Sequence, residues 1–234
     1  QAYFQYDSKK SGGVTRSHLR FGDQPIHSTY YVENADFISC SLDEYVFKYD
    51  MVSNLRKGGT FLLNTTFSAE EIEDRLPNSF KKALAEKEAN FYIINATAIA
   101  AGIGMGRRTN TILQSAFFKL ANIMPYDEAV EFMKAAAKKS YSKKGDAIVQ
   151  KNFAAVDASL AHLHKVEYPA EVTSTFNRLL PVPADAPEFV KKVTGEIIAD
   201  RGDLLPVSAF SEVVDGTWPT GTTKFEKRCI ATEI

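Results

Sequence analysis

Apolar runs that alternate with amphipathic segments constrain the fold of this chain more than any other feature. Three short runs stand at Ala35–Leu42, Thr60–Asn64 and Asn90–Asn95. A strand of a parallel sheet is covered on both faces, so it is expected to be apolar throughout and not alternately polar. The segments between the runs have helical periodicity, as crossover helices do. The sequence therefore predicts an α/β fold, a three-layer domain with a mainly parallel sheet.

Residues that begin and end helices divide the first part of the chain further. Asp43 is placed to cap a helix over Glu44–Leu55, which the Lys57-Gly58-Gly59 run would end. Ser68 and Glu71 have the spacing of a capping box, which predicts a helix start there. A further helix is expected over Phe80–Ala89.

The rest of the chain is predicted to hold a helical cap and then an extended region. Three helices are expected between Asn110 and His164, so residues 1–168 would form one α/β domain. Recurring prolines predict a linker at 169–214, with one short helix at Pro187–Arg201. The Gly- and Thr-rich tail, 215–234, is too polar for a core of its own and is expected to lie against another domain.

The segment Asp7–Gly22, DSKKSGGVTRSHLRFG, concentrates charge and glycine near the start of the chain. Its four Lys and Arg residues stand against one carboxylate, whereas the whole chain has 28 Lys and Arg against 29 Asp and Glu. Glycines let a ligand approach the backbone, and they turn N–H groups toward an anion. The segment fits a site for a phosphate-bearing ligand.

A solvated hairpin is the second interpretation of the same segment, and composition alone favours it. Arg16, His18 and Arg20 are two residues apart, so a strand would place them on one face, exposed to solvent. Such a basic face also discourages aggregation of an edge strand. Turn residues at 22–25 would lead to the run Ile26–Tyr31.

Three other groups of residues have some features of a binding site, and none fits one well. The loop Gly102–Arg108 resembles a phosphate-binding loop before a helix, but it lacks the order of strand, glycine turn and helix, so a plain connection is favoured. His162 and His164 would point to different faces of a helix. Cys40 and Cys229 form no CxxC unit, so no cysteine-built metal site is expected. No catalytic residue is assigned within the chain.

Five segments in the same order resemble the third, γ-type domain of pyruvate:ferredoxin oxidoreductases. They are YDSKKSGGVTRSHLRFG (6–22), KGGTFLLN (57–64), GMGRRTNTILQ (104–114), KKGDAIVQKNFAAVDASLAHLHKV (143–166) and DGTWPTGTTKFEKR (215–228). The last is similar to the Glu-Lys-Arg linker that precedes the ferredoxin-like domain of those enzymes. The family's glycine-rich strand–loop–helix would stand upstream of Gln1. The resemblance thus implies an internal fragment of a longer enzyme, which alone would be inactive.

The resemblance implies the activity and the cofactors of the intact enzyme. The family couples oxidative decarboxylation of pyruvate to formation of acetyl-CoA. Thiamine diphosphate with Mg²⁺ would activate the keto acid, and [4Fe–4S] clusters would carry electrons to ferredoxin or flavodoxin. The fragment itself would hold none of these cofactors, since the thiamine-binding and ferredoxin-like domains lie elsewhere in the polypeptide.

The resemblance also implies a ligand for the basic segment, because the γ-type domain is regarded as the coenzyme A-binding part. Coenzyme A carries several phosphate charges, and charge-assisted hydrogen bonds from Arg or Lys are strong. The residues implied near coenzyme A are Ser11, Gly12, Gly13 and Thr15, with Lys10, Arg16 and Arg20 as further candidates.

Expected partners follow from the same resemblance, and two alternatives stay open. The partners are the other domains of the polypeptide, ferredoxin or flavodoxin, and a second copy in a homodimer. The alternatives are a pyruvate:NADP oxidoreductase, with a flavin reductase fused to the same core, and a non-catalytic interaction module.

Binding to nucleic acid is disfavoured because the net charge of the chain is −1. No apolar run reaches the roughly 18 residues of a membrane span, and no signal pattern is present, so the expected location is the cytoplasm or an anaerobic organelle.

Overall fold

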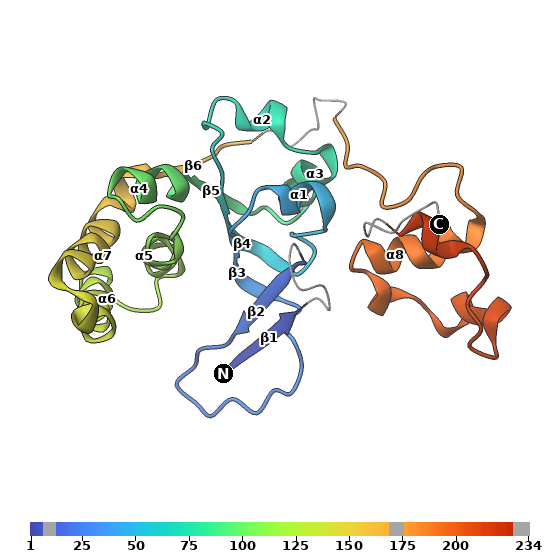
Figure 1. Cartoon of the computed structure of the whole chain (residues 1–234), viewed down its shortest axis with the longest axis horizontal. Coiled ribbons are helices and arrows are strands. Elements are labelled where there is room, and N and C mark those ends of the chain that lie inside the picture. Colours follow the sequence, from blue (N-terminus) through green and yellow to red (C-terminus); the bar gives the residue numbers. More distant parts are fainter. Residues whose placement is uncertain (7–12, 169–175, 227–234) are drawn as a thin grey trace.

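A four-stranded sheet with the order β3-β4-β5-β6 forms the centre of the computed structural model, which describes residues 1–6, 13–168 and 176–226. The first three strands are parallel, and the last runs antiparallel to β5 (Figure 1). The predicted α/β fold with a mainly parallel sheet is confirmed. The strands are β3 (Ala35–Cys40), β4 (Leu55–Asn64), β5 (Asn90–Ile94) and β6 (Leu163–Lys165).

Helices cover both faces of this sheet, which gives the three layers that the sequence predicts (Figure 1). One face is covered by α1 (Glu44–Lys48), α2 (Ile72–Arg75) and α3 (Asn78–Glu86). The other is covered by α4 (Ala96–Gly102), α5 (Asn110–Ala121) and α7 (Asp146–Ala158), with α6 (Tyr126–Tyr141) packed on α5 and α7. Single 3₁₀ turns follow α6 and α7 at Ser142–Lys144 and Leu160–His162. The predicted helical cap is confirmed.

The apolar run of β4 explains why the sheet is buried on both faces. Phe61, Leu62 and Leu63 are all fully buried. Phe61 and Leu63 face the α1–α3 side, where Phe61 packs against Phe80 and Phe91 with ring centroids 5.2 and 6.2 Å away. Leu62 faces the other layer. Successive side chains of a strand alternate between its faces, so an unbroken apolar run supplies both cores.

A two-stranded antiparallel hairpin stands at one end of the sheet (Figure 1). It pairs β1 (Ala2–Tyr6) with β2 (Thr15–Leu19), in a register that sets Phe4 opposite Ser17 and Tyr6 opposite Thr15. The predicted hairpin near the N-terminus is confirmed. The strand that pairs with β2 is not the one expected from the sequence. Residues 26–31 form no strand, and β2 pairs with β1.

The Gly58-Gly59 pair does not end a helix, and this corrects the expected boundaries. Helix α1 ends at Lys48, and the Asp50 carboxylate then accepts the N–H groups of Val52 and Ser53 in a tight turn. The strand begins at Leu55 and carries both glycines within it. A Cβ on Gly59 would lie 2.8 Å from the Leu55 side chain, and Gly58 has a φ of 74°. The pair therefore forms an irregularity in the β3–β4 register, where a side chain does not fit.

The predicted capping contacts are present at Ser68 and Glu71 and absent at Asp43. The Ser68 hydroxyl accepts the Glu71 N–H, and the Glu71 carboxylate accepts the Ser68 N–H, so the predicted capping box is confirmed. Asp43 makes no capping bond, because its carboxylate accepts the Thr65 hydroxyl at 3.0 Å. His164, expected in a helix, lies in β6.

Residues 181–226, here called the C-terminal unit, form a separate lobe at the end of the chain (Figure 1). A small cluster of Val182, Ala186 and Val190 contacts Phe225, so the tail lies against the preceding helical segment. That segment contains a π-helical turn, Val190–Thr194, and α8 (Gly195–Ile198), with 3₁₀ turns at Gly202–Leu204, Val207–Val213 and Thr222–Phe225. The domain boundaries at residues 168 and 214 stay predictions.

None of the helices in the described part of the chain has the length and apolar character that a membrane span requires.

Candidate functional site

A groove of about 1150 Å³ opens between the hairpin and the sheet. Its walls come from β2, from β3 with the loop that follows it, and from the C-terminal end of α5. Because β3 is the edge strand of the four-stranded sheet, the groove lies along an open sheet edge. The predicted site residues Thr15, Arg16 and Arg20 are among those that line it.

The basic face of β2 is turned into the molecule, toward this groove. Arg16, His18 and Arg20 are partly buried, whereas Thr15, Ser17 and Leu19 alternate with them and are exposed. The three basic residues share one face of the strand, as predicted. The prediction that this face is exposed to solvent is wrong. The reason is that His18 and Arg20 contact aromatic rings and a carbonyl group of the 30–32 loop, and Arg16 pairs with Asp200.

Two of the three basic residues hold the loop at Tyr30–Val32. The Arg20 guanidinium donates to the Tyr31 carbonyl at 2.9 Å and lies 5.0 Å from the centre of the Tyr30 ring. The His18 ring stacks on Tyr31 with centroids 4.7 Å apart. The groove wall is thus ordered by contacts that leave several guanidinium N–H groups of Arg20 for a ligand.

His18 is held neutral, and its ring N–H is buried in the wall of the groove. Its Nδ1 accepts the Val32 N–H at 3.1 Å, so the ring proton resides on Nε2. Burial, together with the neighbouring Arg16 and Arg20 charges, lowers the pKa of His18 below its usual 6.5. Nε2 is buried without a hydrogen-bond partner among the described residues. A buried donor without a partner favours binding of an acceptor group.

The His18 contact is expected to weaken in acid. Because the pKa of His18 is lower in the folded protein than in the unfolded chain, the unfolded chain takes up a proton first as the pH falls. The contribution of neutral His18 to folding stability is therefore complete above about pH 6.5. It is lost as the pH falls through the pKa of His18 in the folded protein. Protonation of Nδ1 removes the acceptor of the Val32 N–H. The amide resonance of Val32 should therefore shift between pH 7.5 and pH 5. A His18→Phe variant keeps the stacking and should abolish that shift; an equal shift in the variant contradicts the assignment.

The remaining residues of the predicted site fall in different places. The Gly13 carbonyl accepts the Tyr45 hydroxyl at 3.4 Å, which places this glycine beside the groove. Thr15 lines the groove, and its side chain is on the exposed face of β2, the face opposite to that of Arg16. Lys10, Ser11 and Gly12 lie outside the described residues.

Sequence reasoning missed several residues of the groove. Asp36 lines it and is paired with Arg56, and Asp50 lies in the wall contributed by the loop before β4. Asp200, from the C-terminal unit, forms an ion pair with Arg16. These residues are far from the basic segment in sequence, and no local spacing relates them to it.

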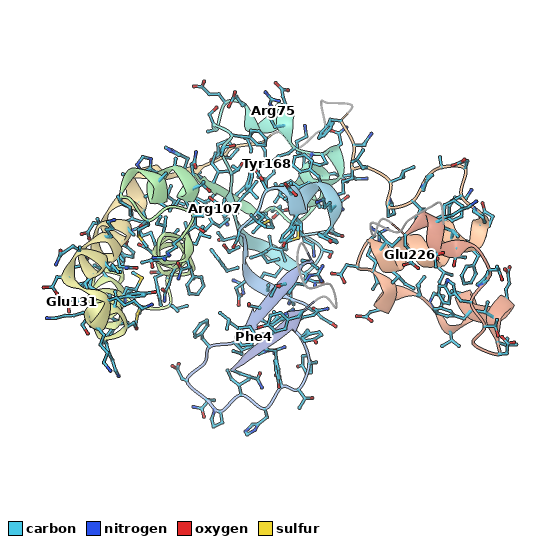
Figure 2. The ribbon with its side chains drawn as sticks, viewed as in Figure 1. Phe4, Arg75, Arg107, Glu131, Tyr168 and Glu226 are labelled. Carbon is cyan, nitrogen blue, oxygen red and sulfur yellow. The ribbon has the colours of Figure 1, made fainter. Side chains whose placement is uncertain are left out.

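The glycine-rich loop at 102–108 lies apart from the hairpin. It joins α4 to α5, and the Lys151 ammonium donates to the Gly104 carbonyl at 3.0 Å. Figure 2 shows Arg107 well separated from Phe4 of the hairpin. The two candidate phosphate sites of the sequence are therefore distinct, and only the hairpin borders the large groove.

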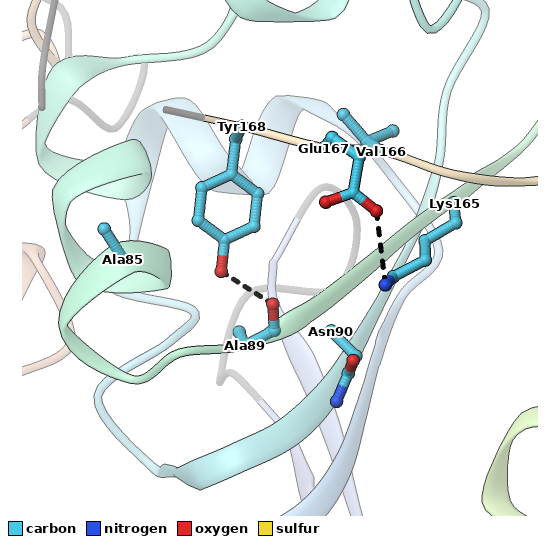
Figure 3. Close-up of a pocket in the computed structure, with 7 residues that line it drawn as sticks. All are labelled: Ala85, Ala89, Asn90, Lys165, Val166, Glu167 and Tyr168. Carbon is cyan, nitrogen blue, oxygen red and sulfur yellow. Dashed lines mark hydrogen bonds and ion pairs between the residues drawn. The ribbon is translucent and has the colours of Figure 1, made fainter. Parts of the chain in front are cut away.

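A second, smaller pocket of about 250 Å³ lies where β5 begins and β6 ends (Figure 3). The Tyr168 hydroxyl donates to the Ala89 carbonyl at 2.6 Å, and Lys165 pairs with Glu167 at 3.2 Å. The Asn90 amide donates to the Gly58 carbonyl, and the pocket contains no residue of the predicted site.

The described residues offer neither a metal-binding cluster nor a reactive thiol. They contain no group of three or more His, Cys, Asp or Glu side chains that could hold a metal ion. The Cys40 thiol is buried and donates to the Leu42 carbonyl, and burial raises its pKa to about 12. It is therefore a protonated thiol at neutral pH and not a nucleophile.

Comparisons with known proteins agree over the whole chain. Residues 1–162 match the family model described as pyruvate ferredoxin/flavodoxin oxidoreductase, and residues 175–231 match a model described as a domain of unknown function. A crystal structure of the pyruvate oxidoreductase subunit PORC from Thermotoga maritima has the same fold, with a TM-score of 0.54 and 20% identity. The match covers 71% of this chain and 81% of that subunit.

Curated relatives match at higher identity. The pyruvate:ferredoxin oxidoreductase of Moorella thermoacetica is 50% identical, and the pyruvate-flavodoxin oxidoreductase of Klebsiella pneumoniae is 47% identical, each over all 234 residues. The matched region is 20% of the length of each relative, so the chain spans about a fifth of them. With more than half of its residues inside the family model, the chain belongs to the pyruvate ferredoxin/flavodoxin oxidoreductase family.

Proposed function

We propose that this segment works within an enzyme that converts pyruvate and coenzyme A to acetyl-CoA and CO₂. Two electrons leave the substrate and pass to ferredoxin or flavodoxin. The names of the relatives at 43–50% identity support this activity. Thiamine diphosphate, Mg²⁺ and [4Fe–4S] clusters would supply the redox chemistry from other parts of the polypeptide, and the residues described here bind and orient a substrate.

Within that enzyme, the groove beside β2 binds the phosphate-bearing part of coenzyme A. The observation that carries this proposal is the set of N–H donors on one face of β2, from Arg16, His18 and Arg20, along a groove of about 1150 Å³. The Nε2 of His18 has no partner among the described residues, and each guanidinium has five N–H donors. Backbone groups at Gly13 and Thr15, with Lys10, Ser11 and Gly12, complete the proposed binding segment.

The charges of the groove favour an anionic ligand only on the side formed by β2. Arg16, whose partner is Asp200, and Arg20 stand on one wall, and on the other the Arg56 charge is paired with Asp36. A phosphate group is therefore expected to lie against β2, and the pantetheine arm of coenzyme A would extend along the apolar wall. That wall includes Phe117, Leu120 and Ile123 from α5 and the residues after it.

Matched ligands test the proposal in the full-length enzyme. Pantetheine and 4′-phosphopantetheine differ by one phosphate group. Since a hydrogen bond to a charged group contributes about 1.5–3 kcal/mol, the phosphorylated compound should compete with coenzyme A at least tenfold more strongly. Calorimetric competition measures the ratio. Equal competition by the two compounds would remove the phosphate-binding role from the groove.

We also propose that the outer face of the hairpin docks another domain of the same polypeptide. Phe4 and Tyr6 are 56% and 71% exposed, and Leu19 lies on the same exposed face. A contiguous exposed apolar face is typical of an interaction surface. The support for an occupant within the polypeptide is that the relatives are five times as long as the matched region.

Replacing both Phe4 and Tyr6 by serine is expected to lower the melting temperature of the full-length enzyme. Loss of two partly buried aromatic anchors at an interface costs about 2–4 kcal/mol. The matched control is Phe132→Ser, which removes an aromatic side chain that is 63% exposed on α6. Calorimetry of the three proteins should show a loss for the hairpin variant alone. An equal effect of the control would argue against a specific docking face.

A further inference from the structure

We propose that Asp200 competes with the ligand for Arg16, so that an anion bound in the groove releases the C-terminal unit from the hairpin. The inference rests on the proposed coenzyme A site and adds a regulatory contact to it. Its partners are one residue of β2 and one residue at the end of α8.

The Arg16–Asp200 ion pair joins the hairpin to the C-terminal unit. The Arg16 Nη2 contacts the Asp200 Oδ2, and the two side chains are 25% and 30% exposed. A pair so far withdrawn from water is screened less by salt than a surface pair. The same guanidinium lines the groove, so the carboxylate already occupies part of the proposed anion site.

Asp200 presents its carboxylate from a firmly held turn. The Asp200 N–H donates to the Ile197 carbonyl and the Arg201 N–H to the Glu196 carbonyl, which closes α8 in the pattern of a Schellman motif. The Arg201 guanidinium adds two bonds to the Glu196 carboxylate at 2.7 and 2.8 Å. The turn therefore fixes the position of the Asp200 carboxylate through contacts that do not involve Arg16.

The backbone of Asp200 is in a conformation that favours glycine. Its φ is +61°, in the left-handed region, which residues with a Cβ adopt only at an energetic cost. Glycine is the usual residue at this position of a Schellman motif. An aspartate there is costly to the fold, and its side chain makes the contact with Arg16. Such strain points to a role for the side chain.

The segment that precedes the C-terminal unit is held to the α/β domain by contacts of its own. Phe176 packs on Phe47 with ring centroids 5.9 Å apart, and the Arg178 Nε donates to the Val46 carbonyl at 3.1 Å. Both contacts tie residues 176–178 to α1. Loss of the Arg16–Asp200 pair would thus remove a contact between the unit and the hairpin while the preceding segment stays attached.

Competition follows from the charges. A phosphate that approaches Arg16 meets the Asp200 carboxylate, so the two anions exclude each other. Linkage is reciprocal: if Asp200 weakens ligand binding by some factor, the ligand weakens the Asp200 contact by the same factor. A diphosphate makes bidentate contacts with an arginine, which favours the ligand when it is present.

The test is coenzyme A binding to the full-length enzyme with Asp200→Asn, which keeps the size of the side chain and removes its charge. Affinity should rise about 3–10-fold, as a coupling of roughly 1 kcal/mol predicts. Asp203→Asn is the matched control, since it removes the same charge from an exposed residue three positions on. Hydrogen exchange should also show that coenzyme A increases exchange at residues 196–202 in the wild type, but not in Asp200→Asn.

Other outcomes overturn the inference in distinguishable ways. Binding of coenzyme A that Asp200→Asn leaves unchanged or weakens would mean that Asp200 does not compete, while the proposed site would stand. Absence of coenzyme A binding in every protein would overturn both the site and the inference.

Discussion

Replacement of Arg16 and Arg20 by glutamine in the full-length enzyme is expected to weaken coenzyme A binding about 100-fold. Both residues line the groove on the same face of β2. Each charge-assisted hydrogen bond to a phosphate contributes about 1.5–3 kcal/mol, and two of them exceed the roughly 2.7 kcal/mol that corresponds to 100-fold. The KM for coenzyme A should rise accordingly, and the KM for pyruvate should stay unchanged. Calorimetric titration checks the binding constant directly.

The matched control removes the same number of positive charges from the glycine-rich loop at 102–108, which is the other candidate phosphate site. Arg107→Gln with Arg108→Gln removes two positive charges from the glycine-rich connection between α4 and α5. Because this loop lies apart from the hairpin (Figure 2), coenzyme A binding should be unaffected. If this control weakens binding and the hairpin variant does not, the phosphate site belongs to the glycine-rich loop.

Phe80→Ala is expected to destabilise the α/β domain by about 3–5 kcal/mol, which is the usual cost of truncating a buried phenylalanine. Phe80 is fully buried on α3 and contacts Phe61 and Phe91 with ring centroids 5.2 and 5.9 Å away. The substitution leaves a cavity between α3 and the two central strands. Urea unfolding of the 234-residue chain, followed by far-ultraviolet circular dichroism, measures the loss.

An exposed phenylalanine is the control for this core variant. Phe132→Ala on α6 should change the free energy of unfolding by about 0.5 kcal/mol or less. A loss below 1 kcal/mol for Phe80→Ala would mean that α3 does not pack against the sheet as described.

The layers of the fold follow from local patterns in the sequence. The continuous apolar runs at 60–64 and 90–95 predict buried parallel strands because they are too short for helices and amphipathic segments stand between them. The structure places Phe61 to Leu63 fully inside. The Ser68 and Glu71 capping box likewise depends only on residues three positions apart. Such features are predictable because the interactions that produce them are local.

The features that sequence reasoning missed depend on contacts between distant residues. Gly58 and Gly59 have the composition of a helix end, and only the pairing of β3 with β4 makes them a strand irregularity. The inward orientation of the basic face depends on the Tyr30–Val32 loop, which no periodicity relates to β2. Asp200 reaches Arg16 from the far end of the chain.

The candidate site was predicted at the level of a segment and less well at the level of side chains. Alternation along β2 places Arg16 and Arg20 together, and the structure has them on one face. The same alternation places the Thr15 side chain on the opposite face, although the resemblance had grouped it with the ligand-binding residues. The segment was identifiable because charge and glycine concentrate in it, whereas its second wall comes from β3 and α5.

Hydrogen–deuterium exchange of the full-length enzyme, with and without coenzyme A, tests the hairpin site most directly. The groove assigns the ligand to the inner face of β2 and the loop that β2 holds. Coenzyme A should therefore slow exchange at residues 14–20 and 30–32, and the effect should vanish in the Arg16→Gln, Arg20→Gln enzyme. Slowed exchange at residues 102–110, with none at 14–32, would contradict the assignment.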